Sequence, residues 1–422
     1  MKFDLSLYLK AKESSLDESY AFLEQCEVNS VWIAANTTLA ENNAELALEL
    51  FESLYSRVEE KHKILLNMGL CNKSAGRVNT AIDCALAAVK LNPQYVLGYF
   101  FLFECYAYTG DYFTAWQYQE WSFGDSVLNH PSLDISKKRR LDWSDPYVQW
   151  ALYNREGITV GKPEITEEEQ LHIYSEITSS ITNKRIWIMS SQGLGDIIQT
   201  THLVKRLLEF YPQCVLLCVR PELFRVVSYM FAGEERVQIC GGMPSESDYD
   251  FFIPLYSVYK LLTVDSSTVD PWFSINPIEV SFSRHLMKNP GKTLGIVWRG
   301  NPAHSNDAKR SLTLQQLVTM LGDVSDKQLY SLQFDVTPEE KALLAELGIV
   351  DCSSKIRDLY DIGCFLSNLD LFVTIDSAPL HLAGALGVNT LALLPEGFED
   401  WRWGITGDRK WYSSVKLIRF KR

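Results

Sequence analysis

Residues 190–203 read SSQGLGDIIQTTHL and stand between the apolar run RIWIM, residues 185–189, and the amphipathic run LVKRLLEF, residues 203–210. This order is typical of a strand, a glycine loop and a helix in a sheet of parallel strands. The loop matches neither GxGxxG, which needs a glycine at Ile198, nor a P-loop, which ends in Gly-Lys-Ser/Thr. Its second glycine is followed at once by Asp196. The stretch therefore predicts a Rossmann-like domain with a carboxylate at the mouth of its first loop.

The same alternation of apolar strands and amphipathic helices continues from this loop to the end of the chain. A first series reaches about residue 288, and a second series begins at TLGIVWRG, residues 293–300. We therefore predict two consecutive Rossmann-like domains, residues 185–288 and 289–422. In such sheets, ligands bind at the carboxyl ends of the strands.

The first third of the chain repeats with a period of 34 residues. Ala47, Ala81 and Ala115 follow this spacing, and Gly76 and Gly110 occupy one equivalent position, where the first copy has an asparagine. A small residue at a helix crossing and a glycine at a turn are what a stack of helix–turn–helix repeats needs, and the pattern resembles tetratricopeptide repeats. A generic helical bundle is the alternative. We predict helical repeats over 1–130 and a connection over 131–184. The repeats either hold a peptide or brace the next domain.

Composition excludes several classes of function. A net charge of −13 over 422 residues argues against broad binding to nucleic acid or to anionic membranes. No run approaches the roughly 18 apolar residues of a membrane span. Nine cysteines are scattered with no CxxC pair or zinc spacing, so we expect no metal site and a reducing, cytoplasmic location. Cys214 and Cys218 lie in the apolar run CVLLC and are predicted to be core residues.

Polar residues gather after the strands of the second series. After LFVTI comes DSAPLHLAGALG, in which Asp376 and Ser377 open a helix that carries His381 one turn inside. A helix start offers free N–H groups and a positive dipole end, which suit a diphosphate. For His381, packing inside the helix layer is the alternative to a ligand contact. Further donors follow the first and last strands of this series: Arg299, Asn301, His304, Lys309 and Arg310, then Trp401 and Arg402.

Several motifs in order carry a family resemblance. QGLGDIIQ, GIVWRGNPAHSNDAKRSL, YSLQ, DSAPLHLAGALG and EDWRWG occur in this sequence over about residues 60–415. The series resembles bacterial tetratricopeptide-repeat-linked glycosyltransferases of the GT-B fold, related to the heptosyltransferase family and more distantly to O-linked N-acetylglucosamine transferase. The resemblance implies a fold class of helical repeats followed by a GT-B pair of Rossmann-like domains. It also implies inverting, metal-independent transfer from a nucleotide sugar, with no cofactor.

The resemblance also assigns roles to individual residues. Asp196 matches the acid that serves the heptosyltransferase-like families as catalytic base. The segment from Asp376 to Leu382 matches the donor-diphosphate motif, and Lys309 or Arg310 would steady the same diphosphate. From the residues themselves we further predict donor contacts at Gly193, Gly195 and Arg299, and possible donor or acceptor contacts at Gln192, Asn301, His304, Trp401 and Arg402.

Other interpretations stay open from the residues themselves. Asp196 is also a favoured residue type for capping the helix that follows it. The chain as a whole could be a repeat scaffold with an inert GT-B part, or a nucleotide-sugar epimerase. The acceptor could be a protein or peptide held by the repeats, a glycan or another hydroxyl-bearing molecule, with nucleic acid less favoured. Self-association through the repeats also stays open.

Overall fold

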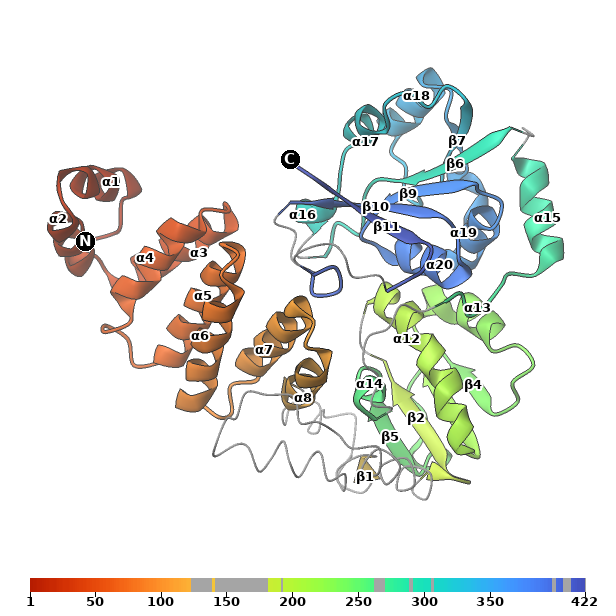
Figure 1. Ribbon diagram of the computed structural model, residues 1–422, viewed down its shortest axis with the longest axis horizontal. Helices are drawn as coiled ribbons and strands as arrows, with labels where there is room; N and C mark the ends of the chain where they lie inside the picture. Colours follow the sequence, from red (N-terminus) through yellow and green to blue (C-terminus); the bar gives the residue numbers. More distant parts are fainter. Residues whose placement is uncertain are drawn as a thin grey trace. The chain divides into compact units, whose positions relative to one another are not determined.

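The computed structural model describes residues 1–122, 139–140, 181–190, 193–261, 270–287, 291–304, 307–396, 400–404 and 411–421 (Figure 1). The chain divides into two compact units. The helical unit is Met1–Leu133 with Glu399–Ile405, and the sheet unit is Asp134–Phe398 with Thr406–Arg422. The predicted fold class, helical repeats followed by two Rossmann-like domains, is confirmed. Gln192 and most of the predicted connection over 131–184 lie outside the described residues.

The helical unit consists of helices in sequential pairs, drawn red to orange in Figure 1. Their bounds are α1 (Leu5–Ser14), α2 (Leu16–Gln25), α3 (Val28–Ala40), α4 (Ala44–Leu54), α5 (Lys61–Ser74), α6 (Val78–Leu91), α7 (Val96–Thr109) and α8 (Tyr112–Ser122). Three equivalent alanines 34 residues apart lie near the start of α4, α6 and α8 and are fully buried: Ala47, Ala81 and Ala115. The predicted small residue at each helix crossing is therefore confirmed.

The turns within these pairs show why the period is visible in the sequence. Asn42, Gly76 and Gly110 each have a positive φ, of 67°, 78° and 93°. Asparagine and glycine are the residues that tolerate this left-handed conformation at a helix end. The three turns thus demand the same residue types at the same spacing, which confirms the predicted repeat.

The first sheet domain has five parallel strands in the order β1-β5-β2-β3-β4. Its elements are β1 (Arg139–Arg140), β2 (Arg185–Met189), α12 (Leu194–Leu207), β3 (Cys214–Cys218), α13 (Pro221–Met230), β4 (Val237–Cys240), β5 (Phe251–Pro254) and α14 (Ser257–Leu261). From β2 the chain adds β3 and β4 on one side, and then crosses to β5, which lies between β2 and β1 on the other side. The strand order therefore reverses between β2 and β5, which is the ligand-binding position in sheets of this kind.

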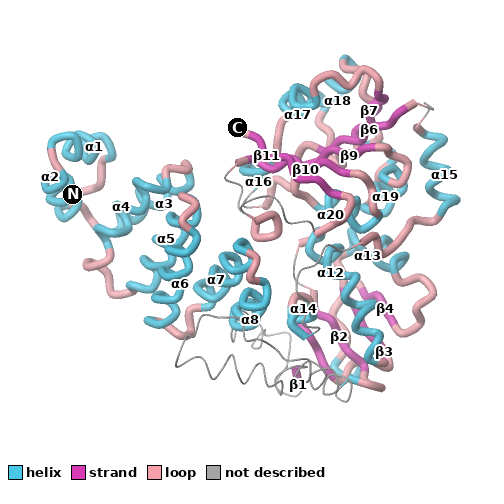
Figure 2. The backbone as a smooth tube through the Cα atoms, in the orientation of Figure 1, coloured by secondary structure: helices cyan, strands magenta, loops and turns pink. Residues whose placement is uncertain are grey.

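The second sheet domain has six parallel strands in the order β11-β10-β9-β6-β7-β8 (Figure 2). Its elements are α15 (Pro277–Leu286), β6 (Lys292–Val297), α16 (Asp307–Arg310), α17 (Leu314–Leu321), β7 (Lys327–Ser331), α18 (Pro338–Glu346), β8 (Val350–Asp351), α19 (Leu359–Leu366), β9 (Leu371–Ile375), α20 (Ala378–Leu386), β10 (Thr390–Pro395) and β11 (Val415–Phe420). Strand interiors such as Ile296 and Val373 are buried, because helices cover parallel strands on both faces. The order reverses between β6 and β9.

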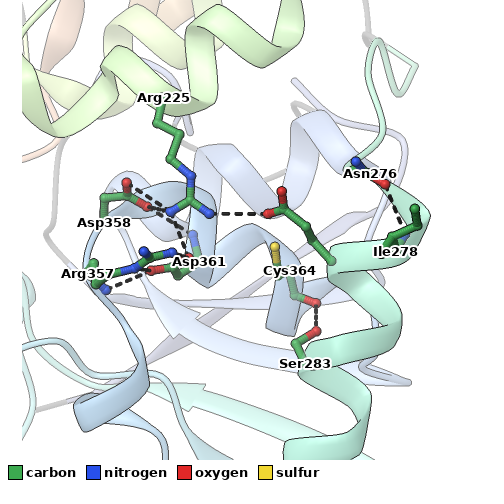
Figure 3. A network of polar contacts seen from close by, with 9 residues as sticks. Arg225, Asn276, Ile278, Ser283, Arg357, Asp358, Asp361 and Cys364 are labelled. Atoms are coloured by element: carbon green, nitrogen blue, oxygen red, sulfur yellow. Dashed lines mark hydrogen bonds and ion pairs between the residues drawn. The ribbon is translucent and has the colours of Figure 1, made fainter.

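An ionic network joins the two sheet domains. The guanidinium of Arg225, on α13, bonds to Asp361 at 2.8 Å, to Asp358 at 3.2 Å and to Glu279 at 3.2 Å (Figure 3). Arg357 also bonds to Asp361, at 2.8 Å. Burial acts to raise the pKa of Asp361, but the hydrogen bonds from Arg357 and Arg225 outweigh it and hold the pKa below its usual range. Asp361 is therefore ionised, and the network is a charged contact between α13 and α19.

The prediction for Cys218 is wrong. Cys218 at the end of β3 is half-buried and forms a disulfide with Cys240, its register partner at the end of β4. The two Cα atoms are 4.6 Å apart, a separation that a disulfide can bridge. The 22-residue spacing gave no sign of this pair, because only the register of neighbouring strands brings the two residues together. Cys214, at the start of β3, is half-buried.

No helix within the described ranges combines the length and the apolar character that crossing a bilayer requires.

Candidate functional site

The glycine loop lies at the point of order reversal in the first sheet domain. Gly193 is the N-cap of α12, so the helix begins at Leu194 and already includes Gly195 and Asp196. Asp196 is the third residue of the helix, and its Oδ2 accepts a hydrogen bond from the N–H of Gly193 at 2.9 Å. This is one half of a capping box, since glycine has no side chain to complete the other half. Asp196 is half-exposed and so combines a cap with a position at the loop's mouth.

The equivalent point in the second sheet domain lies between the carboxyl ends of β6 and β9. Asp376 and Ser377 follow β9 directly and are both buried. Ser377 is the N-cap of α20, and its hydroxyl donates to the carbonyl of Ile375 at 3.4 Å. The side chain of Ser377 does not cap the helix. The predicted helix start at this position is therefore observed, with Pro379 inside the first turn.

The two points of order reversal meet where α12 packs on α20. The imidazole of His381 lies so close to Gly195 that a Cβ at Gly195 would be 2.5 Å from its Cδ2. His381 is only 4% exposed. Its Nδ1 is 2.7 Å from the hydroxyl of Tyr412, and its Nε2 is 3.8 Å from Oδ1 of Asp376. The structure therefore brings together three predicted site residues, Gly195, Asp376 and His381, and adds Tyr412.

Of the two basic residues Lys309 and Arg310, only Arg310 lies against the backbone of the loop after β6. A Cβ at Gly300 would be 2.7 Å from a terminal nitrogen of Arg310 and 2.5 Å from Oδ1 of Asp307. Arg310 also pairs with Asp307 at 3.3 Å, and both side chains are mostly buried. Lys309 is exposed and makes no ion pair within the described ranges. Arg310 is thus the one that lies against the carboxyl-end loop of β6.

Arg299 is engaged elsewhere. Its guanidinium donates to Asp335 at 2.5 Å and to Glu340 at 2.8 Å, and the hydrogen bond to Glu340 raises the pKa of Arg299. Gln333 accepts from the backbone N–H groups of Trp298 and Arg299, at 3.2 Å each. These contacts brace the loop after β6, and the predicted contact of Arg299 with a diphosphate stays a prediction.

Trp401 and Arg402 belong to the helical unit. The Trp401 ring is buried against Phe103 and Trp116, with ring centroids 5.2 and 5.7 Å away. Arg402 stacks on Trp401 at 4.3 Å and pairs with Asp400 at 3.0 Å. Both predicted contact residues therefore have packing partners on α7 and α8 or within their own turn, and their predicted role toward a ligand stays a prediction.

The remaining predicted contacts, Asn301 and His304, are exposed in the loop after β6. Asn301 accepts from the N–H of Ala303 at 3.0 Å, which is a local turn contact. Their predicted role toward a ligand stays a prediction. Across the described ranges, no three His, Cys, Asp or Glu side chains gather as a metal-binding group.

A hollow of about 550 Å³ opens in the first sheet domain, away from these residues. It is lined by Lys205, Glu209, Met230, Arg236 and neighbouring residues, at the C-terminal end of α12. Asp196 lies at the other end of the same helix. At 1.5 Å per residue, roughly 14 Å of helix separates the two, so the hollow is distinct from the point of order reversal.

His202 lies on α12, and its pKa is lower than the usual value for histidine. Its Nδ1–H donates to the carbonyl of Gln199 at 2.6 Å, and its ring packs on Trp272 with centroids 5.3 Å apart. Burial lowers the pKa of His202 to about 4. The structure therefore holds this imidazole neutral.

This shift predicts a pH-dependent stability. Between pH 6.5 and 4 the unfolded chain binds a proton at His202 that the folded chain does not, so stability is full above that window and falls as the pH drops through it. The contribution is about 1.4 kcal/mol for each pH unit. Urea unfolding at pH 6.5 and 5.5 should show this loss in the wild type and a smaller loss in His202→Gln. Equal losses in the two proteins would show that another group is responsible.

Comparison with solved structures finds similar folds, with TM-scores below 0.5 for the three structures described below. No known protein family matches the chain, and no curated protein sequence does. A glycosyl transferase of family 9 from Veillonella parvula covers 57% of this chain and 87% of its own, at 11% identity and a TM-score of 0.41. An ADP-heptose lipopolysaccharide heptosyltransferase II from Escherichia coli covers 56% and 90%, at 15% identity and a TM-score of 0.40.

An O-GlcNAc transferase variant from Thermobaculum terrenum covers 89% of this chain and 83% of its own, at 11% identity and a TM-score of 0.23. All three TM-scores lie below 0.5, so these similarities carry no functional argument here.

Proposed function

We propose that this protein is a glycosyltransferase that moves a sugar from a nucleotide-diphosphate donor to a hydroxyl-bearing acceptor, with inversion and without a metal ion. The observation that carries the proposal is the contact between Gly195 and His381. Because of it, the ligand-binding positions of two Rossmann-like domains lie next to each other. One position presents a carboxylate, Asp196, and the other presents the start of α20.

The donor is assigned to the second sheet domain. The start of α20 directs backbone N–H groups and the positive end of a helix dipole toward the carboxyl edge of β9. Arg310 supplies a cation at the neighbouring strand end, next to the backbone of Gly300. A helix start and an arginine can stabilise the negative charge that develops on a leaving diphosphate, which is the task a metal ion performs in other enzymes.

Asp196 is assigned the role of general base. In the proposed reaction its carboxylate takes the proton of the acceptor hydroxyl while the acceptor oxygen attacks the anomeric carbon. The bond from that carbon to the diphosphate oxygen breaks, and the nucleoside diphosphate leaves from the opposite face. Proton transfer to a positioned carboxylate typically contributes about 10²–10⁴-fold to the rate. The cap that Asp196 makes with Gly193 would hold its carboxylate in place.

The competing function is a repeat scaffold with an inert sheet unit. Such a chain has no need for a half-exposed acid in a glycine loop that packs on the start of α20. The acceptor class stays open among proteins, glycans and other hydroxyl-bearing molecules. The helical repeats favour a protein acceptor.

A thermal-shift screen against UDP-, GDP-, ADP-, CDP- and dTDP-sugars tests the proposal. A donor at 100 times its Kd stabilises the protein by about 2.7 kcal/mol, so at least one should raise the melting temperature clearly. Free sugars and inorganic diphosphate serve as controls, and ligand-observed NMR confirms each hit. A wild-type protein that binds none of these nucleotide sugars would refute the proposal and favour the scaffold.

A further inference from the structure

We propose that Tyr412 is a positioning residue that fixes the tautomer of His381 and thereby holds the Asp196 loop against the donor segment. This inference rests on the proposed function and extends it to a residue that the sequence motifs did not single out. Tyr412 is fully buried, although it precedes β11 at the far end of the chain from Asp196. Its hydroxyl meets Nδ1 of His381 at 2.7 Å.

The surroundings of His381 select one tautomer. Its Nε2 faces the carboxylate of Asp376, whose Oδ1 is 3.8 Å away and can only accept when ionised. The 3.8 Å separation is too long for a hydrogen bond, but a proton on Nε2 would still point toward the carboxylate and leave Nδ1 as an acceptor. Tyr412 must then donate its hydroxyl proton to Nδ1. The opposite tautomer would turn a lone pair of Nε2 toward the carboxylate, which is unfavourable in a buried position.

The ring of Tyr412 is itself held firmly. A Cβ at Gly384 would lie 2.5 and 2.6 Å from its two Cδ atoms, so the ring rests directly on the backbone of α20. On another side, the ring stacks with Trp272 at 6.0 Å and an interplanar angle of 23°. Trp272 in turn donates from its indole to Thr201 on α12 at 3.2 Å. The hydroxyl of Tyr412 therefore has little freedom to leave Nδ1.

The orientation of His381 affects the proposed base, Asp196, through the contact of its ring with Gly195. The His381 ring fills the space in which a Gly195 side chain would stand, so its orientation sets how closely the glycine loop approaches α20. Asp196 follows Gly195 directly in the chain. An imidazole that turns or changes tautomer would shift the base relative to the donor, and small displacements of reacting groups cost large factors in rate.

The first test is spectroscopic and needs no ligand. Long-range ¹H–¹⁵N spectra of histidine-labelled protein report the protonated nitrogen of each imidazole, and the His381→Asn spectrum assigns the signals of His381. We expect one Nε2–H tautomer in the wild type and a tautomer mixture in Tyr412→Phe, which keeps the ring and its packing. Tyr249→Phe is the matched control, because Tyr249 is a buried ring that packs on Trp187, outside the site. An unchanged His381 signature in Tyr412→Phe would overturn the inference.

The second test uses the nucleotide sugar that gives the largest thermal shift. Release of its nucleoside diphosphate by hydrolysis should be about tenfold slower in Tyr412→Phe than in the wild type. The donor Kd should change by less than about twofold, since a positioning residue affects turnover more than binding. In a His381→Asn background the same Tyr412→Phe change should have no further effect, because the two residues act as one unit. Equal turnover, or losses that multiply in the double variant, would overturn the positioning role.

The two failures can be told apart. A wild type that binds donor and a Tyr412→Phe variant that is as active as Tyr249→Phe would overturn this inference and leave the proposed function intact. A wild type that binds no nucleotide sugar would refute the proposed function, and the ¹⁵N spectra would still decide whether Tyr412 sets the tautomer of His381.

Discussion

Asp196→Asn should lose about 10²–10⁴-fold in turnover of the donor while still binding it. The amide keeps the size of the side chain and can still accept the hydrogen bond that Gly193 donates to Oδ2. It has no carboxylate to take the proton of an acceptor hydroxyl. Donor binding is assigned to the start of α20 and to Arg310, neither of which the change touches. The measurement is donor affinity by calorimetry beside nucleotide release under single-turnover conditions.

A second aspartate provides a matched control for the capping role. Asp248 lies three residues after Ser245 and accepts from its N–H at 2.8 Å, as Asp196 does from Gly193. It precedes β5 and so lies at the amino ends of the strands, whereas Asp196 follows the carboxyl end of β2. Both Asp→Asn changes should cost no more than about 1 kcal/mol of stability, the usual range for a cap. Only Asp196→Asn should lose turnover. If Asp196→Asn stays fully active, Asp196 is a cap and the base lies elsewhere.

Gly384→Ala should destabilise the sheet unit by about 1–3 kcal/mol, because the added methyl group overpacks a full core. The new Cβ would lie within 2.6 Å of both Cδ atoms of Tyr412 and closer still to its Cγ. The Tyr412 ring cannot move aside easily, since Trp272 stacks on it. Alanine gains up to about 1 kcal/mol in helix propensity over glycine, which reduces the net loss but does not cancel it.

Gly241→Ala is the control for this substitution. A Cβ at Gly241 meets no atom within 4 Å, so the change should leave the melting temperature nearly unaffected. For a unit of this size each kcal/mol corresponds to about 2–4 °C, which calorimetry resolves easily. A Gly384→Ala protein as stable as the wild type would mean that Tyr412 is not packed on α20 as described. In that case its bond to His381 would also be in doubt.

Local patterns in the sequence predicted the parts of the fold that depend on near neighbours. The turns at Asn42, Gly76 and Gly110 share a left-handed backbone, so their residue types recur every 34 positions. The order of apolar strands and amphipathic helices predicted both sheet domains. The helix start at Ser377 was predicted for the same reason, because caps and strand ends are local features.

Contacts between distant segments could not be predicted in this way. Tyr412 meets His381 across 31 residues, and nothing in the run WYSS indicates a buried hydroxyl donor. Trp401 packs on Phe103, almost 300 residues earlier, and so belongs to a different unit from the strand that precedes it.

The acidic partners of basic side chains could not be predicted either. The sequence shows which basic residues are present, but not which carboxylates pair with them in the folded chain. Arg299 is a typical phosphate-binding residue type in a loop after a strand. Asp335 and Glu340, 36 and 41 residues further on, accept hydrogen bonds from its guanidinium, and no pattern in the sequence indicated these partners. For the same reason, the sequence could not show whether Lys309 or Arg310 lies against the loop after β6. Arg310 folds over Gly300, whereas Lys309 points to solvent.

The measurement that tests the central claim most directly is amide chemical-shift mapping of a nucleoside diphosphate on the labelled protein. UDP, GDP, ADP, CDP and dTDP would each be titrated into the full chain. We predict that at least one shifts the amides of Gly300, Ser377 and Ala378 in a saturable way, because these flank the reversal point between β6 and β9. Shifts confined to the hollow beside Lys205, or no shifts at all, would contradict a donor site at the start of α20.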